Sequence, residues 1–395
     1  MYNTIYLEKL LNLKKNLSVK LITGCRGVGK TTLLKMFANY LKNNGVSDKE
    51  IIFIDFERET ILDFNTLYEY ISKKVAGLEN AYILLDEIDS VENWEKAVIA
   101  LFTGLPVEIY ATGADERVLT QKMKKLLTDN CDVLEMYPLS FAEFLKVQDN
   151  EKPSEESFEK FTNFGSMSFI VEENTSEETK KRLLNGICYE TFFRDAVIKH
   201  SLRDADLFRG IVYFLAKHIG QPIRTKNIVE YFKSINKKVT IFTVDNYLNI
   251  IDKIGILRKI HRYDVNEEKI LNGGENFYCV DTGILNALSN FEGVEKIGLI
   301  KNLVVSELLR NGYEVRVAKL GAMNIDFMAV SKGKKIYIQV LPDDNSKTIT
   351  ELLRPLHKLS AETEKILISS EPLKIKGNVK NITITDFLLN YFVKK

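Results

Sequence analysis

The stretch from Val19 to Phe37, VKLITGCRGVGKTTLLKMF, constrains the fold of this chain more than any other. It opens with Val19–Thr23, which has the apolar composition of a buried strand. Apolar residues then recur at helical spacing from Leu33 to Leu41. The residues between, Gly24–Thr31, match the pattern G-x-x-x-x-G-K-[ST]. A strand, this loop and a helix in that order predict a phosphate-binding P-loop.

The residue types in the loop suit a nucleoside triphosphate and its metal ion. Glycines allow successive backbone N–H groups to surround the β-phosphate, and the start of the helix adds partial positive charge. Lys30 can reach the β- and γ-phosphates, and the Thr31 hydroxyl can bind Mg²⁺. We therefore predict ATP and Mg²⁺ as cofactors. The candidate nucleotide contacts are Gly24, Arg26, Gly27, Val28, Gly29, Lys30, Thr31 and Thr32.

A second apolar strand, in AYILLDEID, ends in the carboxylate pair Asp86 and Glu87. In a P-loop ATPase, Asp86 would hold the Mg²⁺ shell and Glu87 would orient or deprotonate the attacking water. Thr112, at the end of the later strand VEIYATG, is a candidate sensor of the γ-phosphate. Its alternative interpretation is a strand-end hydroxyl that caps a turn.

Length and composition set the class of protein. The 395 residues suggest two to four domains, and 55 Lys plus Arg against 54 Asp plus Glu give no overall attraction to nucleic acid or membranes. The four cysteines are far apart and form no CxxC pair, which argues against a disulfide framework or a structural zinc site. We see no signal peptide and no apolar run long enough to span a membrane, so we expect a cytoplasmic protein.

Four apolar strands alternating with helical stretches predict a parallel α/β sheet. Together with the stretches ITGCRGVGKTTLL, ILLDEID, NWEKAVIAL, YATGADERVL and MYPLSFAEF, the chain resembles the AAA-like, STAND-related prokaryotic P-loop ATPases. The resemblance covers nearly the whole chain. It implies an ATPase domain at 1–148, a helical lid at 149–205, a winged helix at 206–290 and a C-terminal α/β domain similar to restriction endonucleases at 291–395.

The chain departs from that family at two places. The family commonly has two arginines inside the P-loop, and the second is Gly27 here. It also carries a Gly-Arg pair before the Pro-Leu-Ser stretch, where this chain has Asp129-Asn130. An arginine there would stabilise charge on the γ-phosphate, so its loss leaves nucleotide binding intact and predicts slow hydrolysis. Arg194, Arg203 or an arginine of another subunit are the remaining sources.

The segment after Leu207 has the pattern of a winged helix, with three short helices followed by a strand pair. In the third helix, an apolar face leaves Asp245 and Asp252 pointing outward, where they would repel DNA. Residues 205–265 nevertheless hold 11 Lys plus Arg and 5 Asp plus Glu. The basic residues gather at Arg258, Lys259 and Arg262 in the wing and at Lys233, Lys237 and Lys238 before the third helix. DNA binding is thus open, and a partner-binding module is favoured.

The C-terminal part, from Ile297, predicts one helix, three strands, a helix and another strand, the core order of PD-(D/E)xK nucleases. Glu307 and Asp326 are candidate metal ligands. In KIYIQVL, period-2 alternation puts Gln339 and Leu341 on one face. The motif needs a lysine where Leu341 stands.

Two further lysine positions bear on the same question. Lys301 stands where the family often has a glutamate. Lys334 and Lys335, in the turn before the strand, could lend an amine from outside the motif. The residues predict a nuclease-like domain without nuclease activity.

The leading hypothesis is a nucleotide-dependent switch: a slow ATPase coupled through the winged helix to a silent nuclease-like domain that binds a protein partner. The alternatives are an ATP-gated DNA nuclease and a DNA-binding regulator. Assembly into a homo-oligomer is also open.

Overall fold

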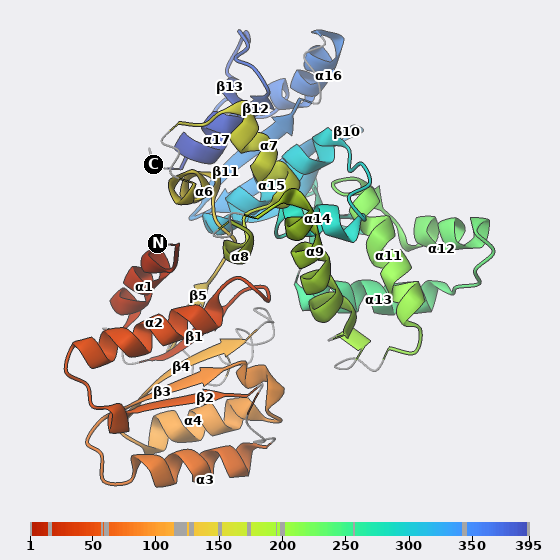
Figure 1. The fold of residues 1–395 in the computed structure, drawn as a ribbon. Coiled ribbons are helices and arrows are strands. Elements are labelled where there is room, and N and C mark those ends of the chain that lie inside the picture. Colours follow the sequence, from red (N-terminus) through yellow and green to blue (C-terminus); the bar gives the residue numbers. More distant parts are fainter. Residues whose placement is uncertain are drawn as a thin grey trace. The chain divides into compact units, whose positions relative to one another are not determined.

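The computed structural model describes residues 2–14, 18–56, 58, 63–113, 125, 130–148, 152–171, 175–194, 196–197, 202–255, 257–341 and 346–392 (Figure 1). Contacts divide the chain into two compact units. The first is Met1–Tyr137 with Lys253–Gly255, and the second is Pro138–Asp252 with Ile256–Lys395.

The first unit is built on a parallel sheet of five strands in the order β2-β3-β4-β1-β5. The strands are β1 (Val19–Thr23), β2 (Ile51–Asp55), β3 (Ala81–Asp86), β4 (Val107–Gly113) and β5 (Cys131–Glu135). The predicted parallel sheet is therefore confirmed, but the count of four strands was wrong. The missed strand, β5, is mostly half-buried, so its composition lacks the continuous apolar run of the others.

Helices cover both faces of this sheet (Figure 1). They are α1 (Tyr2–Leu13), α2 (Lys30–Asn43), α3 (Phe64–Val75) and α4 (Trp94–Gly104), with single 3-10 turns at Asp48–Glu50 and Ile88–Ser90. Leu67 of α3 and Ala97 of α4 pack with Leu21 and Leu85 in one apolar core. On α2, Phe37 packs its ring 4.4 Å from that of Tyr110. Burial of this apolar surface is what holds helices to sheet.

The second unit begins with helices. They are α6 (Phe141–Val147), α7 (Glu155–Phe164), α8 (Ser168–Val171), α9 (Glu177–Cys188), a π-helical turn at Tyr189–Arg194, α11 (Ala205–Lys217), α12 (Thr225–Ser234), α13 (Ile241–Ile254) and α14 (Thr282–Leu288). Ser140 starts α6 with a capping box, accepting from Glu143 N–H while the Glu143 carboxylate accepts from Ser140 N–H. The apolar face predicted for α13 is confirmed, since Val244, Tyr247, Leu248 and Ile251 are buried.

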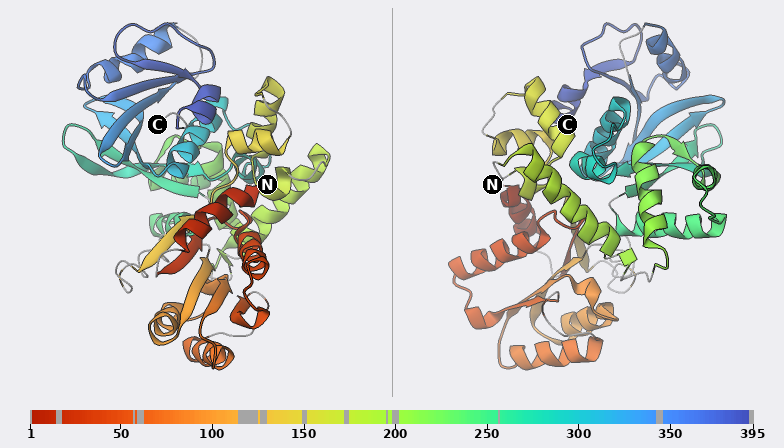
Figure 2. Two further views of the ribbon diagram at one scale, coloured as in Figure 1. Left: turned by 90° about the vertical axis from the view of Figure 1, so that its left-hand side faces the viewer. Right: turned by 45° about the vertical axis from the view of Figure 1, so that its right-hand side comes forward.

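An eight-stranded sheet completes the second unit, in the order β13-β12-β11-β10-β9-β7-β8-β6. Its strands are β6 (Pro222–Ile223), β7 (Leu257–Asp264), β8 (Lys269–Cys279), β9 (Glu314–Leu320), β10 (Met323–Ser331), β11 (Lys334–Val340), β12 (Glu364–Ser369) and β13 (Lys380–Thr383). β7 pairs in parallel with β9, so the hairpin β7–β8 runs on into the C-terminal strands (Figure 2).

The hairpin connection is short, since β8 begins at Lys269 and only four residues separate it from β7. The junction of β7 with β9 differs from expectation, because it joins segments predicted to be separate domains. Helices α15 (Lys296–Arg310), α16 (Ser346–His357) and α17 (Ile384–Asn390) pack on the sheet, and the predicted strand and helix order after Ile297 is confirmed.

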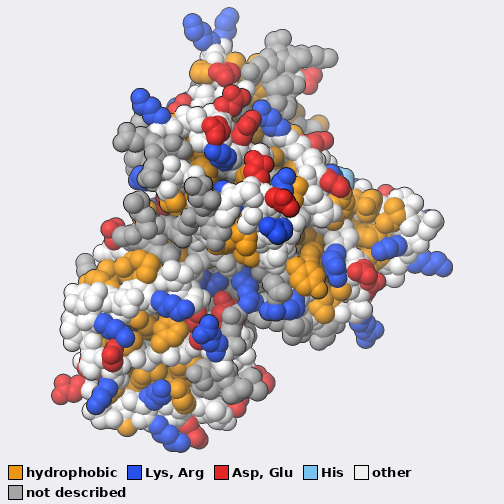
Figure 3. Space-filling view, in the orientation of Figure 1, with side chains coloured by type: hydrophobic (Ala, Val, Ile, Leu, Met, Phe, Trp, Pro, Cys, Tyr) orange, Lys and Arg blue, Asp and Glu red, His pale blue; other side chains and the backbone are white. Residues whose placement is uncertain are grey.

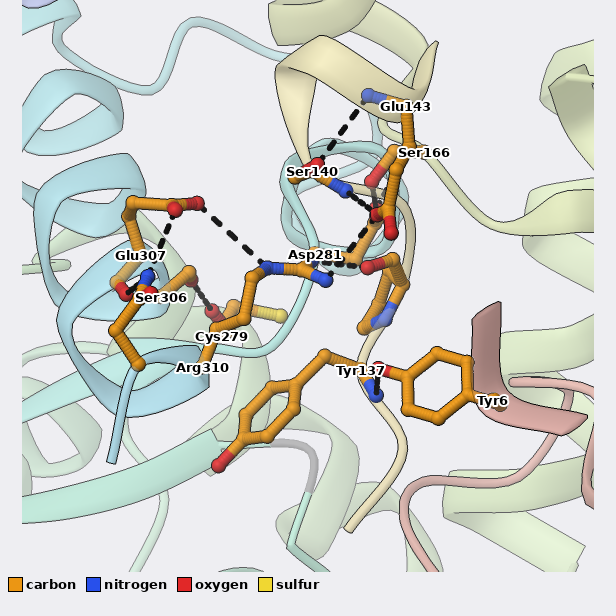
Figure 4. Close-up of polar contacts among 12 residues, drawn as sticks. Tyr6, Tyr137, Ser140, Glu143, Ser166, Cys279, Asp281, Ser306, Glu307 and Arg310 are labelled. Carbon is orange, nitrogen blue, oxygen red and sulfur yellow. Dashed lines mark hydrogen bonds and ion pairs between the residues drawn. The ribbon is translucent and has the colours of Figure 1, made fainter. Parts of the chain in front are cut away.

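Arg310, at the end of α15, joins the start of the second unit to its C-terminal part (Figure 4). Its guanidinium donates to the carbonyl oxygen of Pro138 and lies 3.5 Å from Glu143 Oε2 and 3.6 Å from Glu307 Oε2. Burial raises the pKa of Glu307, and the positive charge of Arg310 opposes that rise. Arg310 therefore compensates two carboxylates that are largely removed from water.

We expect Arg310→Met to lower the free energy of unfolding of the second unit by about 3 kcal/mol, because it leaves buried carboxylates without their cation. Denaturant-induced unfolding followed by fluorescence measures the change. Arg182→Met is the matched control, since Arg182 is exposed on α9 and its hydrogen bond within the described residues is to Thr179 of the same helix. Equal midpoints for the two variants would show that the Arg310 network adds nothing to stability.

Candidate nucleotide site

The loop between β1 and α2 folds as the spacing predicted. Gly24, Gly27 and Gly29 all have positive φ, at 141°, 82° and 97°. Gly24 carries a second requirement, because a Cβ there would collide with the carbonyl oxygen of Met136. Gly29 is the N-cap of α2 and supplies no capping side chain. The first N–H groups of α2 are thus not capped by that residue, which suits an anion at this end of the helix.

Lys30 begins α2 and is buried beneath the loop. Its amine donates to the carbonyl oxygens of Gly24 at 3.0 Å and Cys25 at 3.3 Å. It also lies 3.6 Å from Glu87 Oε1. A γ-phosphate would compete with these three partners for the Lys30 amine. One of them is Glu87, the carboxylate predicted as the base.

Asp86 and Glu87 lie at the carboxyl end of β3. Strand β3 pairs with β4, which in turn pairs with β1, the strand that leads into the P-loop. Thr112 on β4 donates to Asp86 Oδ1 at 2.6 Å and accepts from the Glu87 N–H at 2.9 Å. Glu87 has φ of 56°, an uncommon backbone conformation for a non-glycine residue. The Thr112 hydroxyl is fully buried and engaged with both neighbours, so in this geometry it holds the acidic pair.

The donor set fits Mg²⁺. The Asp86 carboxyl is 2 % exposed and hydrogen-bonds the side chain of Thr31 as well as that of Thr112. Burial raises the pKa of Asp86, and these hydrogen bonds work against the rise. A carboxylate and a hydroxyl are the hard oxygen ligands that Mg²⁺ takes alongside phosphates and water. A buried carboxyl with a raised pKa is also one that a cation would stabilise in its charged form.

The other predicted nucleotide contacts lie around the same loop. Val28 is buried, so its side chain packs inward, whereas Arg26 is half-exposed and Gly27 and Thr32 are exposed. Of the two residues at the altered Gly-Arg place, Asp129 lies outside the described residues. Asn130 accepts from Val19 N–H at 3.0 Å. Arg194 and Arg203 belong to the second unit.

The C-terminal strands keep the predicted alternation but do not gather the predicted metal ligands. Tyr337 and Leu341 lie in one apolar cluster with Leu356 of α16. Gln339 donates to the carbonyl oxygens of Asn324 at 3.1 Å and of Leu352 at 3.3 Å. Leu341 is 3 % exposed, in the position where the motif requires a lysine.

Asp326 is engaged by groups other than a metal. Its Oδ1 lies 2.5 Å from the amine of Lys301, and its Oδ2 accepts from Val340 N–H at 2.9 Å. Glu307 is occupied elsewhere, with Arg310 and Asn311. Lys335 pairs with Glu268 at 3.8 Å. Within the described ranges, no three His, Cys, Asp or Glu side chains gather as a metal site.

The acidic residues of α13 have internal partners. Asp245 accepts from the Thr225 hydroxyl at 2.5 Å, and Asp252 accepts from Lys259 N–H at 2.8 Å. Sequence reasoning read both as free outward charges. Their spacing gave no sign of these bonds, because each partner lies on another element.

Sequence reasoning missed two groups of functional interest: Arg310 with Pro138, and the cleft around Arg224 described below. Arg310 is separated from Pro138 by 172 residues, and no spacing pattern connects them. The only available signal was the Pro-Leu-Ser stretch itself.

Comparison with known proteins agrees with this geometry. A family model described as an AAA domain matches residues 16–145, and one described as a domain of unknown function (DUF8612) matches residues 155–295. The chain is 28% identical over 397 residues to an uncharacterized protein of Haemophilus influenzae, covering 97% of each. It is 27% identical over 342 residues to protein MJ1544 of Methanocaldococcus jannaschii, covering 82% of this chain and 74% of that protein.

Solved structures that are similar to the chain share little identity with it. The Aeropyrum pernix ORC1 protein in complex with DNA has a TM-score of 0.34 at 15% identity, covering 73% of this chain and 92% of that one. AMPPCP-bound DnaA of Aquifex aeolicus has a TM-score of 0.31 at 14% identity, covering 62% and 86%. Among the described residues, no helix is both long and apolar enough to cross a membrane. The family match and the loop geometry together make residues 16–145 an AAA-like P-loop ATPase domain.

Proposed function

We propose that this chain is an ATP- and Mg²⁺-dependent switch, in which a slow ATPase domain changes the packing within the second unit. Lys30 and the loop glycines hold the phosphates, Thr31 and Asp86 hold the metal ion, and Glu87 orients the attacking water. Thr112 fixes the Asp86–Glu87 pair. When bound, Mg²⁺ supplies charge neutralisation at the phosphates.

One observation carries the switch: the segment after β5 contacts the P-loop at Met136 and enters the second unit two residues later, at Pro138. Met136 N–H donates to the carbonyl oxygen of Thr23 at 2.8 Å, and the Met136 carbonyl packs against Gly24. Pro138 then accepts from Arg310 of α15. A shift of the loop on binding phosphate would pull on a segment anchored at both ends.

We divide the chain into an ATPase domain at 1–148, a helical lid at 149–205, a winged helix at 206–290 and a silent nuclease-like domain at 291–395. The order α11, α12, α13 and hairpin β7–β8 supports the winged helix. The order α15, β9, β10, β11, α16 and β12 supports the nuclease-like fold. The apolar Leu341 and the Lys301–Asp326 pair support the loss of cutting. The last domain would serve to bind a partner.

Two substitutions separate binding from turnover. We expect Lys30→Ala to abolish ATP binding, because it removes the cation at the phosphates. Glu87→Gln should keep binding and lower hydrolysis by about 10²-fold, the usual contribution of a positioned base. Isothermal titration and phosphate release measure the two quantities. Glu79→Gln, at an exposed acid before β3, is the control. Unchanged turnover in Glu87→Gln would remove Glu87 from the mechanism.

The nuclease alternative predicts metal-dependent nicking, whereas we expect none. Plasmid incubated with the protein, Mg²⁺ or Mn²⁺, and ATP should remain supercoiled, because no lysine faces the site from residue 341. Nicking that appears in the natural protein and disappears in Asp326→Ala would refute a silent domain.

A further inference from the structure

A cleft other than the P-loop site lies within the second unit. It has a volume of about 510 Å³ and is bordered by residues of α12, β7, β8, β9, β10 and α15. That volume falls in the range of sites for small organic ligands. All the residues that line it belong to the second unit.

The charged residues of the cleft are mostly basic. Arg224, Arg262 and Lys301 line it, against the single carboxylate of Asp326. The Lys301 amine and Val340 N–H occupy both carboxylate oxygens of Asp326. Neither guanidinium forms an ion pair within the described part of the chain. Three cations against one carboxylate leave two positive charges in excess.

Gly274 brings the two arginines together. A Cβ on this residue would lie 3.2 Å from Arg262 Nη1 and 3.8 Å from Arg224 Cγ. The absence of a side chain on β8 therefore lets both arginines lie over the same strand. The positive charges of Arg262 and Arg224 line the same cleft, where they repel each other unless an anion binds there.

The cleft also holds an acceptor without a donor. Asn276 is 3 % exposed and lines the cleft. Its amide nitrogen donates to the carbonyl oxygen of Gly220 at 2.7 Å, which fixes the orientation of the amide. No described group donates to its Oδ1. A buried acceptor of this kind costs stability unless a ligand or water donates to it.

We infer that this cleft binds a nucleotide phosphate without a metal ion, with the phosphate on Arg224, Arg262 and Lys301 and a sugar hydroxyl or base amine on Asn276. A phosphate dianion matches the excess of two positive charges, and guanidinium groups bind phosphate through paired hydrogen bonds. The Lys301 ammonium takes the place beside Asp326 that a metal ion would need. The nucleotide can be free, with a terminal phosphate dianion, or part of a nucleic-acid strand, in which two phosphodiesters of one negative charge each would balance the same excess. On the one face shown in Figure 3, basic and acidic side chains are interspersed.

The test uses the full chain carrying Lys30→Ala, so that the P-loop takes no part and the outcome is independent of the ATPase proposal. Binding of a short fluorescein-labelled single-stranded RNA is measured by fluorescence anisotropy in EDTA, with unlabelled AMP as competitor. Adding Arg224→Ala and Arg262→Ala should weaken binding at least about tenfold, since hydrogen bonds to charged groups are the strong ones. Thermal unfolding checks that the variant folds.

The control pair is Lys226→Ala with Lys233→Ala. It removes two exposed charges from α12, the helix that begins after Arg224, and neither residue lines the cleft. It should change binding less than about twofold. AMP binding is also measured by itself, by isothermal titration. AMP that binds and displaces the RNA would show that the cleft takes free nucleotides as well as strands, AMP binding without RNA binding would assign it to free nucleotides, and RNA binding without AMP binding would assign it to strands. Absence of binding by both probes, loss of binding in EDTA that Mg²⁺ restores, or equal weakening by the control pair would overturn the inference.

Discussion

The backbone of Met136 holds the last segment of the first unit against the start of the P-loop. Its N–H extends the pairing of β5 with β1 by donating to Thr23 at the very end of the P-loop strand. Its carbonyl fits against Gly24 only because that residue has no side chain. Gly24 thus serves two purposes: its positive φ shapes the phosphate-binding loop, and its missing side chain leaves room for Met136. Any larger residue there would push the loop and Met136 apart.

In the second unit, the residues that the sequence offers as a metal site have other partners. A metal-dependent nuclease needs anions that converge and an amine on the strand. Here Lys301 supplies a positive charge directly to Asp326, so the carboxylate is neutralised from within the protein. Leu341 joins the apolar cluster beneath α16. Lys301, which takes the place of a metal ion beside Asp326, also lines the cleft and adds to its excess of positive charge, which is the basis for proposing a phosphate there.

Local patterns in the sequence were enough for much of the fold and for the P-loop. The strand Val19–Thr23 was predicted at its boundaries, and the helix after the loop was predicted from its apolar spacing between Leu33 and Leu41, because the strand, the glycines and the helix each impose a recognisable pattern. The alternation along β11 predicted Gln339 and Leu341 on one face, and both lie against α16. Strand β5 was missed because half-buried edge strands lack a continuous apolar run.

Contacts between distant segments were beyond local patterns. The parallel pairing of β7 with β9 joins two regions that look like separate modules. Arg310 and Pro138 are held together by a hydrogen bond that no periodicity encodes. Asp245 and Asp252 looked like free surface charges until their partners on neighbouring elements were known.

Phosphate binding at the P-loop should alter the segment that Arg310 anchors. Amide hydrogen exchange with and without ATP and Mg²⁺, followed by mass spectrometry, measures this most directly. We expect exchange to change in the peptide spanning 138–147 and in α15 together with the P-loop peptide, and Lys30→Ala to abolish all three changes. Protection confined to the P-loop peptide, with 138–147 and α15 unchanged, would contradict it.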